Sequence, residues 1–454
     1  MLRGEKHLPG RIRLRTSHPA QAVVLAFAGA IAVSTVLLML PVARQGDGSA
    51  PFNVALFTAT SGVCVTGLAV VDTATYWSPF GEAVILASIQ IGGLGIMTLA
   101  SLLGILVARR LGLRARLTAA AETKAIGIGD VRTVVRGVVA VSLLFESATA
   151  TVLFVRLVLG YDESVGDAAY LAVFHSVSAF NNAGFALYSD SLMSFASDPW
   201  VYIPIAVSVI AGGLGFPVWL ELYRRYRFPR RWSLTTMMTL SGTVVLLVAG
   251  TVFFAATEWN NLDTLGAMPT GDRLGMSFFH SVMPRTAGFN AIDYGAVEPE
   301  TLFGTIVLMF IGGGSAGTAG GIKVTTFLLL FFAIYAEVRG EPDVNVLSRR
   351  IEDRAVRQAL TVALLGVAAV MVSTVVLLSI TDLPALPVFF EATSAFATVG
   401  LSTGITAEFS TAGQGVLIVL MFLGRLGPIT LVSALALRGR HRLYHFPKGR
   451  PIIG

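Results

Sequence analysis

Charged residues are scarce in this 454-residue sequence. Asp, Glu, Lys and Arg make up 13% of it, about half of the roughly 25% that soluble domains carry. Hydrophobic residues make up 54%, and the mean hydropathy is +0.73. So few charges cannot cover a water-facing surface, so most of the area must face lipid. The composition excludes a soluble enzyme, a nucleic-acid binder and a disordered protein.

Cysteine is almost missing as well. The single Cys64 excludes a disulfide framework and a Cys-rich metal site, and we expect it to be a small buried side chain. The sequence contains no H-E-x-x-H zinc motif and no phosphate-binding P-loop. We therefore predict no enzyme and no resident cofactor, and any regulation by nucleotide must come from another chain.

The sequence does contain long apolar runs, each about long enough to cross a bilayer as a helix. Eight of them lie at residues 22–42, 80–107, 134–159, 201–222, 234–256, 302–336, 359–380 and 415–437. Four shorter apolar pieces lie at residues 53–66, 168–181, 273–283 and 386–397. These pieces are too short to span and are typical of re-entrant segments. The order is span, short helix, span, four times over.

The charges that are present indicate an orientation. Five basic clusters, at residues 3–15, 109–136, 224–231, 339–357 and 438–450, hold 27 of the 33 Lys and Arg residues. The loops between them carry acids, such as Asp162, Asp198 and Glu298, and few bases. The positive-inside rule then places both termini and all basic loops in the cytoplasm. This topology explains the net charge of +6, with contact to anionic lipid or a partner as a second role.

The four short segments resemble one another. Residues 57–68, 174–185, 279–290 and 390–401 read FTATSGVCVTGL, FHSVSAFNNAGF, FHSVMPRTAGFN and FEATSAFATVGL. Each starts with Phe and contains a glycine followed by a large apolar residue. The glycines are Gly67, Gly184, Gly288 and Gly400, separated by 117, 104 and 112 residues. Glycines that only pack helices would lie inside the spans at four-residue spacing. The period indicates an internal fourfold repeat.

The chemistry of these segments follows from the bilayer. Non-helical backbone at membrane depth is tolerated only where it lines a watery path or is buried in protein. Four short helices ending halfway point their negative ends at one place, which favours a cation. Glycine allows the φ values that turn neighbouring carbonyls the same way. Rings of such carbonyls replace the hydration shell of potassium.

At these residues the chain resembles the Trk/Ktr/HKT superfamily of cation transporters, most closely the membrane subunit of Ktr-type potassium transporters. The matching motifs are TSGVCVTGL, SAFNNAGF, PRTAGFN and ATSAFATVGLST. The resemblance implies an all-α membrane protein with four membrane–pore–membrane units around one pore. It also implies a homodimer and a separate cytosolic ring that binds nucleotide. In this superfamily a serine at the first filter glycine accompanies sodium selectivity, so Gly67 favours potassium.

We therefore expect potassium uptake through the cytoplasmic membrane. The predicted filter for K⁺ is formed by the main chain of Val65, Thr66, Gly67, Asn182, Ala183, Gly184, Thr286, Ala287, Gly288, Thr398, Val399 and Gly400. The predicted parts are a basic arm (1–19), four repeats (20–110, 111–228, 229–340 and 341–437) and a cytoplasmic tail (438–454). A Trk-type or Na⁺-permeable cation transporter is the alternative, and a dependence on sodium stays open.

The second span of each unit carries its own glycines, and those of the third unit are exceptional. The stretch 312–321 cannot hold a stable helix, because each glycine costs about 1 kcal/mol relative to alanine. We predict that it forms a mobile gate loop below the filter. The predicted gate residues are Gly312, Gly313, Gly314, Ser315, Gly317, Thr318, Gly320, Gly321, Lys323 and Arg425.

Five further side chains call for a role. Arg425 replaces a glycine of the second-span motif, and a buried arginine in a span is a functional hypothesis by default. We expect it to act as a barrier to cations and to donate hydrogen bonds to the loop. Arg285 follows the third pore segment, and Glu391 is its candidate partner. His175 and His280 occupy equivalent positions in two segments, where we expect packing or hydrogen bonding instead of a metal site.

Overall fold

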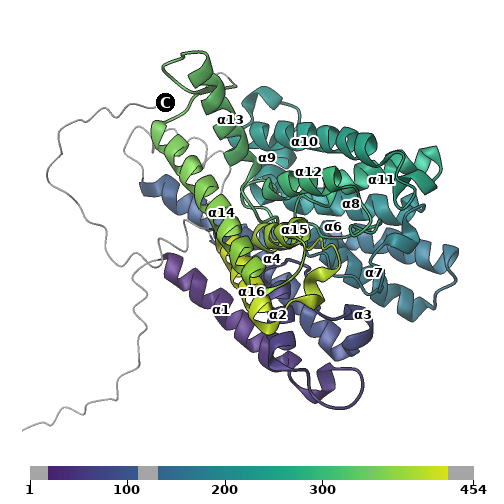
Figure 1. Cartoon of the computed structure of the whole chain (residues 1–454). Helices are drawn as coiled ribbons and strands as arrows, with labels where there is room; N and C mark the ends of the chain where they lie inside the picture. Colours follow the sequence, from purple (N-terminus) through teal and green to yellow (C-terminus); the bar gives the residue numbers. More distant parts are fainter. Residues whose placement is uncertain (1–18, 111–130, 348, 428–454) are drawn as a thin grey trace, which may run out of the picture.

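The chain is built almost entirely of α-helices (Figure 1). The computed structural model describes residues 19–110, 131–347 and 349–427. The basic arm, most of the first basic loop, the end of the last predicted span and the C-terminal tail lie outside these residues. Within them the long helices are α1 (Pro19–Leu38), α4 (Pro79–Arg110), α6 (Val131–Gly160), α10 (Leu234–Glu258) and α14 (Asp353–Ile380).

Four short helices alternate with the long ones, as the sequence predicts. They are α2 (Phe52–Val63), α7 (Val165–Phe180), α11 (Thr270–Val282) and α15 (Ala385–Ala397). The second spans are α4, the pair α8 (Pro199–Leu214) and α9 (Phe216–Arg225), the pair α12 (Pro299–Phe310) and α13 (Val324–Val338), and α16 (Thr411–Leu426). Four membrane–pore–membrane repeats therefore follow one another along the chain.

The remaining elements are small and lie in the connections. They are α3 (Thr73–Tyr76), the 3₁₀ turns η1 (Pro41–Ala43), η2 (Met193–Phe195), η3 (Pro229–Arg231), η4 (Leu265–Ala267) and η5 (Ile405–Glu408), and the strands β1 (Asn345–Val346) and β2 (Arg349–Arg350). The strands pair antiparallel, with Asn345 opposite Arg350. This small hairpin joins the third repeat to the fourth.

Local sequence signals set where several helices begin. At the start of α7, the side chain of Ser164 accepts a hydrogen bond from the backbone amide of Asp167. At the start of α10, the side chain of Ser233 accepts one from the backbone amide of Thr236. Asp198 caps α8 through the amide of Trp200. Such caps satisfy amides that have no partner within the helix. In lipid this accounting is strict, because an unpaired backbone group finds no water there.

The repeats close into a ring. In Figure 1, α2 near the start of the chain lies beside α16 at the other end of the described residues. Helix α16 packs on α2, and the same kind of contact joins α4 to α6, α8 to α11 and α12 to α15. Each repeat thus touches the next, and the fourth touches the first. The four short helices are held on the inside of this ring.

The outward faces of the spans are apolar. On α10, the exposed side chains include Val244, Val245, Val248 and Val252. On α14, Val372 and Val375 are more than 60% exposed. Soluble monomers rarely expose such continuous apolar faces. These faces fit the lipid environment that the composition requires.

Two predicted spans are not straight. Among the described residues, five helices are long and apolar enough to cross a membrane alone, and the bent α8–α9 pair gives a sixth if it is counted as one span. The prediction of one continuous span at residues 201–222 is wrong, because α8 and α9 meet at 94°. The chain turns at Gly215, whose φ is +88°, and Pro217 follows at the start of α9. The predicted span 302–336 is interrupted by a loop between α12 and α13.

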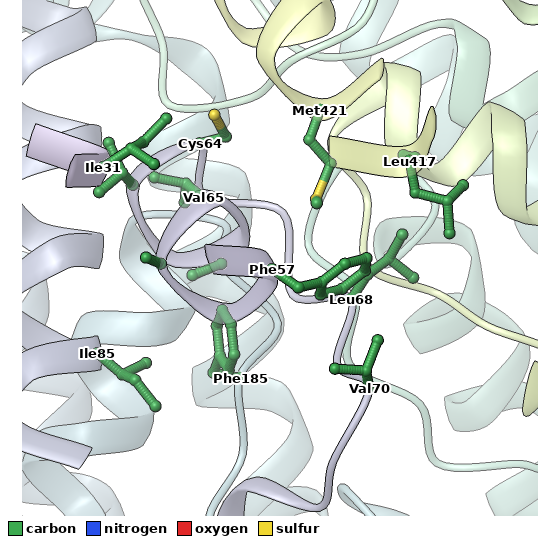
Figure 2. Close-up of a cluster of buried hydrophobic side chains, with 14 of the residues drawn as sticks. Ile31, Phe57, Cys64, Val65, Leu68, Val70, Ile85, Phe185, Leu417 and Met421 are labelled. Carbon is green, nitrogen blue, oxygen red and sulfur yellow. The ribbon is translucent and has the colours of Figure 1, made fainter. Parts of the chain in front are cut away.

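A dense apolar cluster surrounds the first short helix. Figure 2 shows Phe57 of α2 together with Ile31, Ile85, Leu417 and Met421, which come from α1, α4 and α16. All five side chains are buried, and Cys64 is buried in the same cluster, as expected. Protein interiors of this kind are packed like organic crystals and resist deformation. The segment that follows α2 is therefore attached to a rigid, densely packed helix.

Candidate functional site

The segments after the four short helices share an unusual backbone conformation. Val65, Asn182, Thr286 and Thr398 have φ values of 56°, 59°, 71° and 51°. The glycine two positions later in each segment, Gly67, Gly184, Gly288 or Gly400, also has a positive φ, between 70° and 93°. The residue between them does not. Positive φ values at two positions of each segment allow neighbouring carbonyl groups to point toward one side, as in a ring of carbonyls that binds a cation. Left-handed non-glycine residues cost energy and cluster at functional sites.

The four glycines form a closed ring. A Cβ atom at Gly67 would lie 2.4 Å from the carbonyl oxygen of Ala183 and 3.1 Å from the Cα of Gly184. The same relation holds from Gly184 to Gly288, from Gly288 to Gly400, and from Gly400 back to Gly67, with Cβ to Cα distances of 2.9, 3.0 and 3.0 Å. No side chain fits at these positions. The ring brings together the four predicted filter glycines around one axis.

Serines of the short helices hold two of these glycines. Ser61 Oγ accepts a hydrogen bond from the backbone amide of Gly67 at 3.0 Å, and Ser394 Oγ accepts one from the amide of Gly400 at 3.1 Å. In the third repeat Met283 stands in their place, and its carbonyl oxygen accepts the amide of Gly288 at 3.4 Å. These serines were not among the residues predicted from the sequence. Their equal position in the aligned segments was the available signal.

A cavity of about 310 Å³ lies above the glycine ring, on the side of the acidic loops. Its lining includes all four glycines, together with Asp72, Tyr188 and Ser189. The carboxylate of Asp72 accepts a hydrogen bond from Ser189 Oγ. Burial raises the pKa of the Tyr188 phenol, so this ring stays neutral at physiological pH. An acidic cavity leads to the ring and provides an approach for a cation.

The other side of the ring meets the loop between α12 and α13. The loop starts and ends as a closed stem, in which the amide of Gly312 donates to the carbonyl of Ile322 at 2.9 Å. Its middle is held by the end of α8. A helix end leaves carbonyl oxygens without partners inside the helix. The loop amides of Gly314 and Thr318 donate to two of them, Gly213 O and Gly212 O, at 2.7 and 3.2 Å.

The loop also touches the inner end of three filter segments. The amide of Gly320 donates to Thr286 Oγ1 at 3.2 Å. The side-chain nitrogen of Asn182, in the orientation that satisfies its surroundings, donates to Thr318 Oγ1 at 2.7 Å. A Cβ atom at Gly320 would lie 2.1 Å from Thr398 Oγ1. Each contact uses the left-handed residue of its segment, so the loop lies directly below the ring.

Two cationic side chains flank this loop. Arg425 is buried, and its Nη1 donates to the carbonyl oxygen of Thr318, while its Nη2 donates to Gly92 O at 3.3 Å. The expected hydrogen bond to the loop is therefore present. Lys323 Nζ donates to the carbonyl of Ala319. Arg425 can hold the loop in place because it links the loop to α4 of the first repeat. Its positive charge can also repel a cation there.

The expected pairing of Arg285 with Glu391 is wrong. Arg285 Nη2 donates to Thr243 Oγ1 at 3.2 Å, and the side chain lies among residues of α8, α10 and the loop, including Gly313. Glu391 instead accepts hydrogen bonds from Ser402 Oγ, the Thr403 amide and Thr406 Oγ1. The two side chains face different parts of the molecule: Glu391 lies in the middle of α15 and faces the outer return segment. Arg285 follows its helix and faces the loop.

The two histidines make hydrogen bonds of the same kind as Glu391. His175 Nε2 accepts the amide of Leu187 at 3.2 Å, and His280 Nδ1 lies 3.0 Å from the hydroxyl of Tyr294. Both partners belong to the chain that returns from the ring. Among the described residues no group of three or more His, Cys, Asp or Glu side chains is placed to hold a metal ion. The histidines anchor the return segments.

An unpredicted carboxylate lies near the second segment. Glu146 of α6 is buried and accepts hydrogen bonds from Gln90 Nε2 at 3.1 Å and from Asn181 Nδ2 at 3.2 Å. Asn181 directly precedes the left-handed Asn182. The carboxylate thus fixes the end of α7 against α4. Its apolar sequence surroundings, a single acid inside a predicted span, were the signal for it.

Comparison with known proteins decides the family. The model of the TrkH family, described as "Cation transport protein", matches residues 5–438. The chain belongs to this family. The fourfold repeat, the glycine ring and the interrupted third unit are thus features of a TrkH-family protein.

Several curated relatives of this TrkH-family chain span nearly its whole length. It is 39% identical over 436 residues to Ktr system potassium uptake protein B of Bacillus subtilis, covering 96% of this chain and 97% of the relative. The protein of the same name in Vibrio alginolyticus is also 39% identical, covering 95% and 94%. The potassium/sodium uptake protein NtpJ of Enterococcus hirae is 34% identical over 453 residues, covering 98% and 99%.

A solved structure has the same fold. The crystal structure of the potassium transporter TrkH from Vibrio parahaemolyticus matches with a TM-score of 0.71 and 17% sequence identity. The match covers 94% of this chain and 86% of that one. The arrangement of repeats around one axis is therefore shared, and the fold class predicted from the sequence is confirmed.

Proposed function

We propose that this chain takes up potassium across the cytoplasmic membrane through the main-chain carbonyls of the four segments that form the glycine ring. The observation that carries the proposal is the closed contact of Gly67, Gly184, Gly288 and Gly400. A ring of backbone oxygens replaces the hydration shell of a monovalent cation. Two relatives at 39% identity are named potassium uptake proteins, which supports potassium as the ion.

The filter consists of the left-handed residue, the residue after it and the glycine in each repeat. Side chains differ among the repeats at the first two positions, as expected where the ligands are main-chain atoms. The negative ends of α2, α7, α11 and α15 approach the ring, and each adds favourable potential for a cation. The acidic cavity above the ring supplies the entrance.

The loop between α12 and α13 acts as the gate. It is bound below the ring by contacts to Thr286, Asn182 and Arg425. Two carbonyls of α8, Gly212 O and Gly213 O, also accept amides of the loop. All these contacts are polar, so they can exchange for water, and a glycine-rich chain has little intrinsic preference for one conformation. An ion passes when the loop leaves this place. Arg425 adds a positive charge to the closed state.

The orientation of the chain in the membrane follows from its charge distribution, and its partners are inferred from the resemblance to Ktr-type subunits. The positive-inside rule places the basic loops and both termini in the cytoplasm. The inner side of the ring and the gate then face the cytoplasm. The resemblance to Ktr-type membrane subunits suggests a homodimer, and a cytosolic nucleotide-binding ring that docks on the basic side and moves the gate.

A sodium-permeable pore is the second candidate. A relative at 34% identity is named a potassium/sodium uptake protein. The presence of glycine at position 67 favours potassium, since serine at this position accompanies sodium selectivity in the superfamily.

The test is rescue of a bacterium that lacks its own potassium uptake, with and without external sodium. We expect growth at low potassium from the chain expressed with a cytosolic regulatory partner, and no growth from Gly67→Ala. Growth that requires sodium indicates coupling to sodium. Rescue at high potassium alone favours the sodium-permeable candidate, and an absence of rescue by a protein present in the membrane contradicts the proposal.

A further inference from the structure

The segment from α9 to Trp232, residues 216–232, has a composition unlike the rest of the described surface. We name it the elbow segment, because it begins at the 94° bend after α8. It contains five arginines and one carboxylate. Tyr223, Tyr226 and Phe228 are exposed, Tyr223 by 85%. Arginines and aromatic rings alternate along it, with Arg227 over the ring of Tyr226 and Arg231 over that of Phe228.

The bend gives this segment its place. Helix α8 is part of a membrane span, and α9 leaves it at a right angle, so α9 runs along the plane of the bilayer at the basic end of the span. One face is buried through Phe216, Val218 and Glu221. The other presents Tyr223 and Arg224, and the chain that follows α9 carries the exposed Arg227, Arg230 and Arg231. An in-plane helix with basic and aromatic exposed residues is typical of a segment that lies among lipid headgroups.

The lone carboxylate already has hydrogen-bond partners at the start of α10. Glu221 accepts hydrogen bonds from Ser233 and Thr236 and lies 3.8 Å from Arg225. Arg225 Nη1 also donates to the carbonyl of Arg231. The guanidinium groups of Arg227, Arg230 and Arg231 are exposed and carry the excess charge. Guanidinium groups bind phosphate with paired hydrogen bonds.

The loop between α13 and α14 offers a contrast on the same side of the molecule. Residues 339–354 contain four arginines and four carboxylates. Arg350 Nη2 lies 2.7 Å from Asp343 Oδ1, and the exposed residues there include no aromatic ring. A general excess of positive charge on this side therefore does not account for the elbow segment. Its charge is concentrated and is combined with aromatic groups.

The elbow segment is attached to the gate loop through the end of α8. Trp219 Nε1 donates to Ala211 O at 2.7 Å. The next two carbonyls of α8, Gly212 O and Gly213 O, accept the loop amides of Thr318 and Gly314. A Cβ atom at Gly215 would lie 2.7 Å from the carbonyl oxygen of Ser315. The position of α9 and that of the loop thus depend on the same helix end.

We propose that the elbow segment binds the phosphate headgroups of anionic phospholipids through Arg227, Arg230 and Arg231, and thereby favours the loop position seen in this structure. A phospholipid fits because its phosphate matches the arginines and its glycerol and upper acyl region match the exposed aromatic rings. These arginines follow α9 and are joined to its end, because Trp232 Nε1 donates to Arg225 O and Arg225 Nη1 donates to Arg231 O. A bound headgroup therefore restrains α9 and, through it, the end of α8. The carbonyls that bind the gate loop then stay in position.

Binding is tested on the purified full-length chain. Thermal unfolding is followed by the fluorescence of its tryptophans in detergent, with increasing amounts of phosphatidylglycerol or phosphatidylcholine. We expect stabilisation by phosphatidylglycerol. In the triple variant Arg227→Gln, Arg230→Gln, Arg231→Gln the apparent affinity falls roughly fivefold for each arginine removed. The matched control Arg349→Gln, Arg350→Gln, Arg354→Gln removes the same charge from the contrasting loop and keeps the affinity of the wild type.

Three outcomes overturn the proposal. They are equal stabilisation by phosphatidylcholine, equal stabilisation by inorganic phosphate at the same concentration, and an unchanged affinity in the triple variant. A variant with Lys at all three positions keeps the charge but loses the paired hydrogen bonds. It gives an intermediate affinity and replaces the Gln variant if that one does not fold. Loss of a cytosolic partner with unchanged lipid affinity assigns the segment to protein docking instead.

The effect on the gate rests on the proposed function and is measured separately. Rubidium flux into proteoliposomes is compared without and with phosphatidylglycerol. We expect a severalfold lower basal flux with the anionic lipid, and no such dependence in the triple variant. Lipid binding without any change of flux overturns the coupling but keeps the site. Absence of flux in every membrane contradicts the proposed transport and leaves the binding result standing.

Discussion

The amide of Gly320 donates a hydrogen bond to Thr286 Oγ1, which joins the loop below the ring to the filter segment of its own repeat. Thr286 is one of the four left-handed residues at the inner end of the ring. A displacement of the loop therefore frees the hydroxyl of a residue whose backbone shapes the ring. The position of the loop below the ring and the backbone geometry of the filter segment are therefore linked through Gly320 and Thr286.

Gly320 allows a sharp test of the gate. In Gly320→Ala the new Cβ atom would lie 2.1 Å from Thr398 Oγ1 and 2.5 Å from Ala397 O. The loop must move away from the ring, so we expect basal rubidium flux in proteoliposomes to rise severalfold. Gly95→Ala is the matched control, because a Cβ atom there has nothing within 4 Å. Wild-type flux from a folded Gly320→Ala protein contradicts the proposed gate.

Arg425 allows a test of the barrier. In Arg425→Ala the loop loses its hydrogen bond from Nη1, and the positive charge below the ring is removed. Both changes favour passage of a cation, so we expect basal flux to increase by about tenfold. Arg425→Lys keeps the charge and loses the second hydrogen bond, and its flux falls between the two. If uptake by Arg425→Ala equals that of the wild type, Arg425 is no barrier.

The ring itself is tested at Gly67 and Gly400. Alanine at either position must adopt a φ of +93°, at about 1–2 kcal/mol. It also places a Cβ atom 2.2–2.4 Å from a neighbouring carbonyl oxygen. We expect the ratio of potassium to sodium flux to fall at least tenfold. Gly415→Ala, on α16 with open space around it, keeps the ratio. An unchanged ratio in the ring variants removes the glycine ring as the filter.

Ser61 and Ser394 are predicted to position the filter. Alanine at either site leaves the amide of Gly67 or Gly400 without its acceptor, at about 1–3 kcal/mol for a buried group. We expect a lower potassium-to-sodium flux ratio together with retained total flux. The filter segment loses its fixed position, but the ion pathway stays open. Ser277→Ala serves as control, since its hydroxyl only bonds a carbonyl of its own helix. A change in unfolding temperature alone, at a constant ratio, shows a purely structural role.

Glu146 is expected to matter for the second segment alone. Glu146→Ala leaves the amides of Gln90 and Asn181 without their shared acceptor, whereas Glu146→Gln keeps one carbonyl oxygen for them. We predict a loss of selectivity in the first variant and a smaller loss in the second. Flux ratios measured side by side check this order, and the reverse order contradicts it.

The fold could be predicted because the repeat made each part of it visible four times. The short piece predicted at residues 53–66 is α2, Phe52–Val63, and the loop predicted at 312–321 lies inside the break between Phe310 and Val324. Composition was sufficient there, since a run of glycines cannot remain helical. The roles of the filter and gate residues stay predictions.

Other features depended on tertiary contacts that no local pattern contains. The motif IGGLG continues as a helix through Gly95 in α4, whereas AGGLGF turns by 94° at Gly215. The only local difference in kind between the two motifs is Pro217, which follows the second one. The turn at Gly215 packs against the α12–α13 loop, which belongs to another repeat. Arg285 likewise has its neighbours on α10 and the loop, far along the chain, so the pairing with Glu391 could not be judged from spacing.

The break at Gly215 and the contact of Gly400 with Gly67 lead to one consequence. A pore made of four identical subunits must accept every substitution in all quarters at once. Here a single polypeptide supplies all four, so a serine can bind an amide in one quarter while a methionine occupies its place in another. Each repeat is free to specialise, as we propose for the gate loop of the third repeat and the elbow segment of the second.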